Sequence, residues 1–365
     1  MNNKVRVIAF YLPQFHPTPE NDKWWGKGFT EWTNVGKAKP LFHGHYQPKV
    51  PADLGYYDLR VPETRTAQAE MAKEHGVEGF CYWHYWFGNG RELLQRPFNE
   101  VLKSGEPDFP FCLGWANHSW EDKQFSKDGG NKMLMEQLYP GDEDYIQHFN
   151  SVLPAFKDHR YIRVDDKPIF LVYSAFELPD TAHFIRLWQK LAQENGLKGI
   201  HFIGHTANIE DIEPMKKMGF DAVNMVRLFH FFKHDYSIFD RIYLKFMKIF
   251  FNKGRVVDYA KAAKYFSGEE DRREDCYPTI IPNWDHSPRS GRSAHILVNS
   301  TPEKFGKHAK TAFEHVKDKP EEKRIVFLKS WNEWAEGNYI EPDLKFGMSY
   351  LKALKDAINK LSPNK

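Results

Sequence analysis

The chain has 365 residues, 51 Lys+Arg against 49 Asp+Glu, and a formal net charge of +2. This balance provides no strongly basic face, so we expect no nucleic-acid partner. Three cysteines, none in a C-x-x-C pair, cannot form a fully paired disulfide framework. The N-terminal residues lack the apolar core of a signal peptide, and no stretch has the ~18 uncharged apolar residues of a transmembrane helix. The sequence therefore predicts a soluble, cytoplasmic protein.

Eight short apolar runs, rich in β-branched and aromatic residues, recur along the chain. They cover residues 5–12, 77–83, 109–116, 168–174, 199–206, 222–229, 279–284 and 324–331. Near-continuous apolarity, rather than strict alternation, is typical of parallel strands that are covered on both faces. We therefore predict eight buried parallel strands.

A segment with helical patterning follows each of these runs. The predicted helices cover residues 62–75, 91–104, 142–157, 180–195, 209–218, 258–266, 301–317 and 347–361. The first begins at Pro62 and ends before Gly76, which matches the preference for proline at the start of a helix and glycine past its end. Eight strands, each followed by a helix, predict an α/β fold of the (β/α)8 TIM barrel type. The alternative is an open doubly wound sheet, but that fold requires no particular number of strands.

The chain is longer than the ~250 residues that such a barrel typically needs. The extra residues lie mainly near 13–61, 118–141 and 230–257, and each of these segments follows a predicted strand. Because no low-complexity linker separates them, we predict a single domain over residues 1–365, with long insertions on the C-terminal face. Active sites of barrel enzymes lie on that face.

Aromatic rings, amides and carboxylates are frequent at the ends of the predicted strands. Rings with a polar edge suit the C–H faces of sugars, and Asn, His and Glu side chains suit hydroxyl groups. We therefore expect an oligo- or polysaccharide as the partner. The candidate substrate-binding residues are Tyr11, His16, His84, Tyr85, Asn117, Trp120, Tyr173, His205, Asn283, Trp284, Asp285, Trp331, Asn332 and Glu341.

Glu333 and Glu336 follow the last predicted strand. Glycoside hydrolysis needs one carboxyl to protonate the leaving oxygen and a second to act as base or nucleophile. Two carboxyls in one small turn also push their pKa values apart. The alternative, a pair of solvated loop glutamates, is less favoured because residues at strand ends of barrels are preferentially catalytic. We therefore predict that Glu333 and Glu336 are the catalytic pair.

Other features of the sequence have less specific interpretations. Glu31 in the first insertion either holds that insertion to the barrel or contributes to the site. Histidines such as His84 and His118 invite a metal site, but no Cys/His set has the spacing of a zinc site, so we expect neither a metal nor another cofactor. Residues 242–251 mix basic and aromatic residues, which fits a lid or packing insertion better than a helix in weak contact with a membrane surface.

Three motifs carry a resemblance to known proteins. The segment Trp331–Asp343 (WNEWAEGNYIEPD) resembles the N-E-W-x-E-G-x-x-I-E motif of glycoside hydrolase family 99, the endo-α-mannosidase family. With Phe10–His16 (FYLPQFH) and Gly28–Val35 (GFTEWTNV), the chain is more similar still to WbsX-type proteins of bacterial polysaccharide loci, which are often described as glycosyltransferases. The resemblance covers nearly the whole chain and implies a (β/α)8 barrel.

The same resemblance implies a reaction that retains the anomeric configuration. Glu333 would take the proton of the sugar 2-hydroxyl, which then attacks the anomeric carbon to form a 1,2-anhydro sugar. Glu336 would protonate the leaving oxygen and later activate water. The leading hypothesis is therefore a metal-independent retaining glycosidase acting on an α-linked, mannose-like glycan.

Two rival functions remain open. A glycosyltransferase of cell-surface polysaccharide (O-antigen or capsule) biosynthesis is the first, although the chain has no Rossmann glycine fingerprint and no D-x-D triplet for a metal–nucleotide. A sugar-binding barrel without enzymatic activity is the second. The sequence does not determine the oligomeric state.

Overall fold

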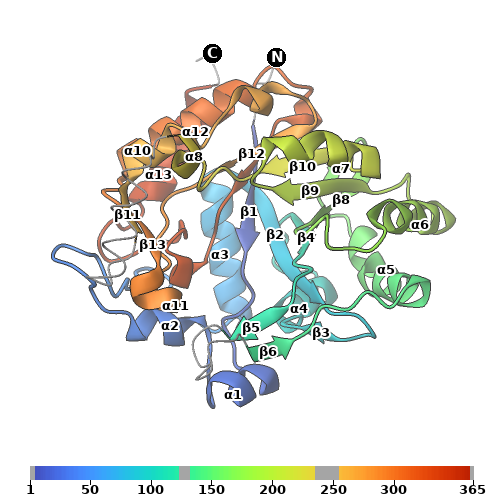
Figure 1. The fold of residues 1–365 in the computed structure, drawn as a ribbon, viewed down its shortest axis with the longest axis horizontal. Helices are drawn as coiled ribbons and strands as arrows, with labels where there is room; N and C mark the ends of the chain where they lie inside the picture. Colours follow the sequence, from blue (N-terminus) through green and yellow to red (C-terminus); the bar gives the residue numbers. More distant parts are fainter. Residues whose placement is uncertain (1–4, 123–131, 235–254, 362–365) are drawn as a thin grey trace.

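A computed structural model describes residues 5–122, 132–234 and 255–361 and confirms the predicted barrel (Figure 1). The parallel strands pair in the order β1, β14, β12, β10, β9, β8, β4, β2, and the pairing of β1 with β2 closes the barrel. The strands of the barrel are β1 (Arg6–Tyr11), β2 (Val77–Trp86), β4 (Phe111–Trp115), β8 (Lys167–Val172), β9 (His201–Thr206), β10 (Ala222–Met225), β12 (Cys276–Ile280) and β14 (Ile325–Leu328).

A helix follows each strand of the barrel and covers its outside. These helices are α3 (Pro62–Glu74), α4 (Arg96–Ser104), α5 (Asp142–Phe156), α6 (Thr181–Glu194), α7 (Ile212–Met218), α10 (Tyr259–Ala263), α12 (Pro302–Val316) and α13 (Ser349–Asn359). Short 3-10 helices lie at η1 (Ile209–Asp211), η2 (Glu269–Arg272), η3 (Gly291–Ser293) and η4 (Glu321–Lys323). Each predicted helix is therefore present, with ends that differ by a few residues.

The seventh strand differs from its prediction. β12 covers Cys276–Ile280, whereas the sequence predicts a strand over 279–284. The predicted run includes Pro282, which lacks the backbone N–H that a central strand uses, and β12 ends before it. In the structure Pro278 lies in the strand opposite Met225. The strand therefore ends earlier, and residues 281–284 belong to the loop above it.

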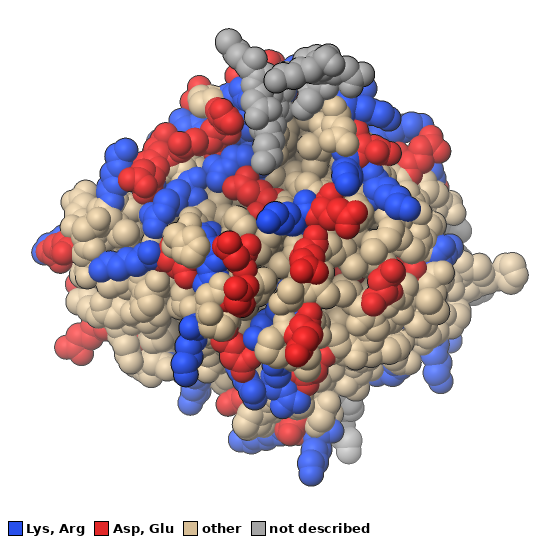
Figure 2. Space-filling model, turned by 180° about the vertical axis from the view of Figure 1, so that it is seen from behind, with Lys and Arg blue, Asp and Glu red and all other residues tan. Residues whose placement is uncertain are grey.

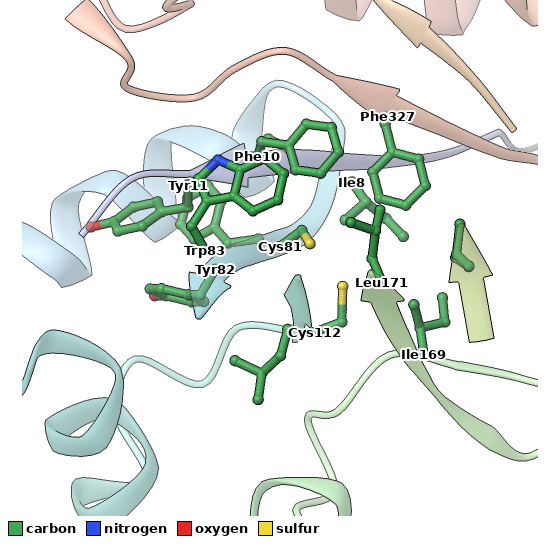
Figure 3. Packing of buried hydrophobic residues seen from close by; sticks show 14 of the residues in the cluster. Ile8, Phe10, Tyr11, Cys81, Tyr82, Trp83, Cys112, Ile169, Leu171 and Phe327 are labelled. Atoms are coloured by element: carbon green, nitrogen blue, oxygen red, sulfur yellow. The ribbon is translucent and has the colours of Figure 1, made fainter. Parts of the chain in front are cut away.

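Aromatic side chains fill the barrel interior just below the C-terminal face (Figure 3). The Phe10 ring lies between Trp83 and Phe327, with centroid distances of 4.7 and 5.0 Å. Gly114 leaves room for this layer, because a Cβ at that position would lie 3.2 Å from the Trp83 ring. Cys81 and Cys112 are buried in the same region as free thiols. This layer fixes the indole of Trp83 under the site described below.

The insertions and the loop after β12 add short elements to the barrel. They include α1 (Pro19–Trp25), α2 (Glu31–Lys37), β5 (Trp120–Asp122), β6 (Lys132–Met135), α8 (Phe231–His234), β11 (Arg255–Asp258), α11 (Ser287–Ser290) and β13 (His295–Val298), while β3 (Glu92–Leu93) and β7 (Arg163–Val164) extend the main sheet. In Figure 1, α1, α2, α11, β5 and β6 lie beyond the carboxyl ends of β1 and β2. The predicted lid or membrane segment 242–251 lies outside the described residues.

Charged side chains are mixed in sign over the surface. On the face seen in Figure 2, Lys and Arg alternate with Asp and Glu, in keeping with the net charge of +2. Among residues 5–122, 132–234 and 255–361, no helix has the length and apolarity needed to cross a bilayer.

Candidate active site

A cleft of about 870 Å³ opens beyond the carboxyl ends of β1, β2, β4, β8 and β14. Its floor carries Lys329, Glu333 and Glu336, which follow β14, and its walls come from the first and second insertions. The predicted catalytic pair therefore lies in the cleft, at the end of the barrel where active sites of this fold are built.

Glu333 directly precedes η5 (Trp334–Glu336), the short 3-10 turn after β14, and Glu336 is the last residue of that turn. The Oε1 atom of Glu333 accepts a hydrogen bond of 2.9 Å from the Trp83 indole. The Asn338 amide lies 3.4 Å from Oε2 of each glutamate, and the Lys329 ammonium lies 3.6 and 3.7 Å from the same two atoms. Because the same amide and the same ammonium contact the Oε2 atom of each glutamate, the two carboxyl groups face each other.

Arg289, on α11 after β12, contacts the other side of Glu336. Its Nη1 donates to Glu336 Oε1 at 2.7 Å, and its Nη2 donates to Glu31 Oε1 at 2.7 Å. Glu31 is 1% exposed and also accepts a hydrogen bond from the backbone N–H of Ala335. Glu31 therefore holds the first insertion to the η5 turn and orients Arg289.

The pKa values of the two glutamates move in opposite directions. Burial raises the pKa of Glu333 above its usual range; Lys329 opposes this, and the nearby Glu336 adds to it. Burial also acts to raise the pKa of Glu336, but Arg289 and then Lys329 outweigh it and bring the pKa below its usual range. The unliganded pair therefore favours a proton on Glu333 and a negative charge on Glu336.

Aromatic rings line the cleft. Of the predicted sugar-binding residues, Tyr85, Trp120 and Tyr173 lie in this lining. Trp120 packs against Tyr85 at 5.2 Å and against Trp24 of α1 at 5.9 Å. Flat rings arranged in this way can stack on the C–H faces of sugar rings.

Several other predicted residues lie behind the lining and support it. The Asn332 side chain bonds both the backbone N–H and the C=O of Leu12, which fixes the η5 turn to the end of β1. Asn117 bonds the backbone of Ser174 and the Tyr139 hydroxyl. Trp331 is fully buried against Phe80. These side chains turn into the protein because strand ends under long insertions are not open to solvent.

Glu341 is the centre of a second buried network. It accepts hydrogen bonds from Tyr57, Gln68 and Trp334 at 2.6–2.8 Å, and Gln68 in turn accepts one from Tyr11. Burial raises the pKa of Glu341 to about 7. Because the Trp334 indole belongs to η5, this network fixes the turn that carries the pair.

Asp285 joins a third network rather than the cleft lining. It is 2% exposed and bonds His45 Nε2 at 2.9 Å and Gln47 Nε2 at 2.6 Å, and Lys49 Nζ lies 3.9 Å away. Opposed by burial, Lys49 and then His45 hold the pKa of Asp285 well below its usual range. Asp285 therefore ties the first insertion to the loop after β12.

The remaining candidates lie beside or below the cleft. His16 bonds the backbone of Pro13, and His84 bonds His148 at 2.8 Å. His205 stacks under Tyr173 at 4.9 Å; burial and then Lys329 lower its pKa to about 3. The last two candidates lie in the loop that follows β12. The ring of Trp284 packs 5.6 Å from the Lys329 ammonium, and Asn283 lines a small separate cavity of about 30 Å³.

Sequence reasoning missed Arg289, Lys329, Trp24 and Trp25, which all line the cleft. Lys329 lies four residues before Glu333, so its spacing was a usable signal. No sequence signal identified Arg289, because its partner Glu31 is 258 positions away in the chain. Among the described residues, no group of three or more His, Cys, Asp or Glu side chains is arranged to hold a metal ion.

Comparisons with known proteins agree on the family and the fold. A family model described as glycosyltransferase WbsX matches residues 7–354. The uncharacterized protein WxcX of Xanthomonas campestris pv. campestris is 36% identical over 357 residues, which are 97% of this chain but 50% of that protein. The chain thus spans about half the length of the curated relatives it matches.

Two solved structures share the barrel. One is the GH99 endo-alpha-mannosidase from Bacteroides thetaiotaomicron, with a TM-score of 0.58, 15% identity, and coverage of 98% of this chain and 97% of that chain. The other is described as a glycoside hydrolase-like protein, with a TM-score of 0.61, 18% identity, and coverage of 98% and 94%. At these identities the likeness shows the (β/α)8 fold alone.

Proposed function

This chain belongs to the WbsX family, and from its site we propose that it is a retaining glycoside hydrolase acting on an α-linked, mannose-like glycan. The observation that carries the proposal is the pair of facing carboxyls, one favouring a proton and one a charge, on the floor of an aromatic-walled cleft. Glycosidases need one carboxyl in each state.

The first half of the proposed reaction forms a 1,2-anhydro sugar. Glu333, as carboxylate, takes the proton of the 2-hydroxyl, and O2 forms a bond to the anomeric carbon. The bond from that carbon to the leaving oxygen breaks, and Glu336 gives its proton to that oxygen. The trans-diaxial 2-hydroxyl and leaving group of an α-mannoside have the geometry that this internal displacement requires, which supports a mannose-like substrate.

The second half restores the enzyme. Glu336, now a carboxylate, takes a proton from water as the water oxygen attacks the anomeric carbon. The anomeric bond to O2 breaks, and O2 takes back the proton held by Glu333. Two inversions at one carbon give overall retention, and the sum of both halves is hydrolysis. The segment Trp331–Asp343, which resembles the motif of the endo-α-mannosidase family, supports the same substrate class.

The pair can be tested by removing each carboxyl in turn. Glu333→Gln and Glu336→Gln keep the side-chain shape, and each is expected to lower kcat on an α-mannoside glycan by at least ~100-fold. Glu63→Gln changes an exposed glutamate at the start of α3 and serves as the matched control. Wild-type turnover in either site variant would overturn the assignment.

A glycosyltransferase is the second candidate, and the description of the family itself favours it. It would use the same cleft but pass the sugar from an activated donor to an acceptor hydroxyl. Calorimetry with nucleotide sugars separates the candidates. Saturable binding of a nucleotide sugar, without glycan cleavage, would favour the transferase over the hydrolase.

A further inference from the structure

Arg289 bridges two carboxylates at the edge of the cleft. Its two terminal nitrogens donate to Glu336 and Glu31 at 2.7 Å each. Glu31 is buried and fixed by the Ala335 N–H, so one end of the bridge is anchored. The Arg289 side chain is 28% exposed and lines the cleft, so a bound molecule can reach it.

The roles proposed above conflict with the charges of the unliganded site. Glu336 is proposed as the proton donor, yet it is the carboxyl that the cations hold ionised. The groups facing Glu336 are Arg289 at 2.7 Å and His286 at 3.9 Å, on α11 and just before it, and Lys329 at 3.7 Å after β14.

The remaining neighbours of Glu336 do not resolve the conflict. Glu333 belongs to the same turn, Glu31 acts on Glu336 from α2, and Asn338 donates to it. His286 supplies little charge near neutral pH, because burial and then Arg289 lower its pKa to about 4. Lys329 is nearly equidistant from both glutamates, so it does not discriminate between them. Arg289 is therefore the cation that distinguishes Glu336 from Glu333.

We propose that Arg289 is a positioning residue that keeps the proton of the pair on Glu333 in the unliganded site, and that a sugar which draws Arg289 away from Glu336 lets that proton cross. The proposal rests on the proposed function. In the step, the O–H bond on Glu333 breaks and an O–H bond forms on the facing oxygen of Glu336. Glu333 is left as the carboxylate that accepts the 2-hydroxyl proton, so charge and atoms balance. Arg289 stays paired with Glu31.

The first test compares two pH profiles, because kcat/KM reports groups of the free enzyme and kcat reports groups of the substrate complex. Removing an adjacent cation raises a carboxyl pKa by about 1–3 units, so Arg289→Gln is expected to move the acidic limb of kcat/KM, where Glu336 ionises in the free enzyme, upward by about one unit or more. The acidic limb of kcat should move less, because the sugar has already displaced Arg289.

Two further variants complete this test. Arg289→Lys keeps a positive charge and is expected to return the kcat/KM limb at least partly toward the wild-type position. Arg292→Gln removes an exposed arginine three residues away and should leave both profiles unchanged. An unmoved kcat/KM limb in Arg289→Gln, or equal shifts in both profiles, would overturn the proposal.

The second test needs no substrate. Carbon-13 NMR of labelled glutamate carboxyls, assigned with Glu333→Gln and Glu336→Gln, follows each proton directly. In the wild type, Glu336 should ionise at lower pH than Glu333, and Arg289→Gln should raise the titration of Glu336. An unchanged Glu336 titration in a variant that keeps its melting temperature would contradict the proposal. If the wild-type protein cleaves no glycan, the proposed glycosidase function is refuted. The titration still tests whether Arg289 lowers the pKa of Glu336.

Discussion

The two ends of the barrel both carry a hollow lined with charged groups, but they arrange these groups differently. At the N-terminal end, a hollow of about 510 Å³ pairs Lys167 with Asp221, Lys216 with Asp275 and Lys323 with Glu274. The side chains of these pairs are 24–60% exposed, and Asp275 has a second cation, Arg273, at 2.9 Å, so the cations there are not outnumbered by the carboxylates they pair with.

At the C-terminal end, three carboxylates share two cations. Glu333, Glu336 and Glu31 are 1–15% exposed in their side chains, and they face Lys329 and Arg289. Exposed ion pairs of opposite sign contribute little to stability. Buried carboxylates that outnumber the nearby cations have shifted pKa values. Charged groups and volume alone therefore do not identify the site; burial and unequal pairing do.

The largest expected effect follows from removing one lysine at each end. Lys329→Met takes away the ammonium that lies beside both carboxyls of the proposed catalytic pair, so kcat on the glycan should fall about 10²–10³-fold. Lys323→Met removes the partner of Glu274 at the other end and should change kcat less than about two-fold, because that pair is exposed. Similar losses of kcat in Lys329→Met and Lys323→Met would contradict the assignment of the site to the C-terminal end of the barrel.

A second prediction uses opposite responses to pH. Burial raises the pKa of Glu341 from 4.5 to about 7, so in that window the folded protein holds a proton that the unfolded chain has released. The free energy of unfolding contributed by Glu341 is therefore lost as pH rises, by up to about 3 kcal/mol. At the N-terminal end, burial and nearby lysines lower the pKa of His201 from 6.5 to about 3, so its contribution is lost as pH falls through that window.

Urea unfolding at several pH values checks both signs. The difference in free energy of unfolding between wild type and Glu341→Gln should decrease as pH rises from 4.5 to about 7. The corresponding difference for His201→Gln should increase as pH rises from about 3 to 6.5. Parallel curves for either pair of proteins would show that the group does not titrate as the structure indicates.

The smallest expected effect concerns the aromatic wall. Trp24→Ala should raise KM for the glycan about 3–10-fold, since a lost ring contact costs about 0.5–1.5 kcal/mol, with little change in kcat. Phe176→Ala removes an exposed ring outside the cleft lining and should leave KM unchanged. A KM change of the same size for Phe176→Ala would argue against stacking on this wall.

The sequence predicts what is local and misses what depends on distant partners. Near-continuous apolarity identifies the strands, although β12 (Cys276–Ile280) begins and ends before the predicted run 279–284. The Glu333/Glu336 pair is local and could be found. Asn332 and Asp285 also follow strands, but the insertions cover them, so they form buried hydrogen bonds instead of lining the cleft. The contact between Arg289 and Glu31 exists only in the folded barrel.

The central claim is tested most directly by proton NMR of the sugar first released by the wild-type protein from an α-mannoside glycan. Two displacements at one anomeric carbon predict that the α-anomer appears first and then mutarotates. A β-anomer that appears first would show inversion, in which a single displacement by water replaces the internal attack of the 2-hydroxyl, and would contradict the account.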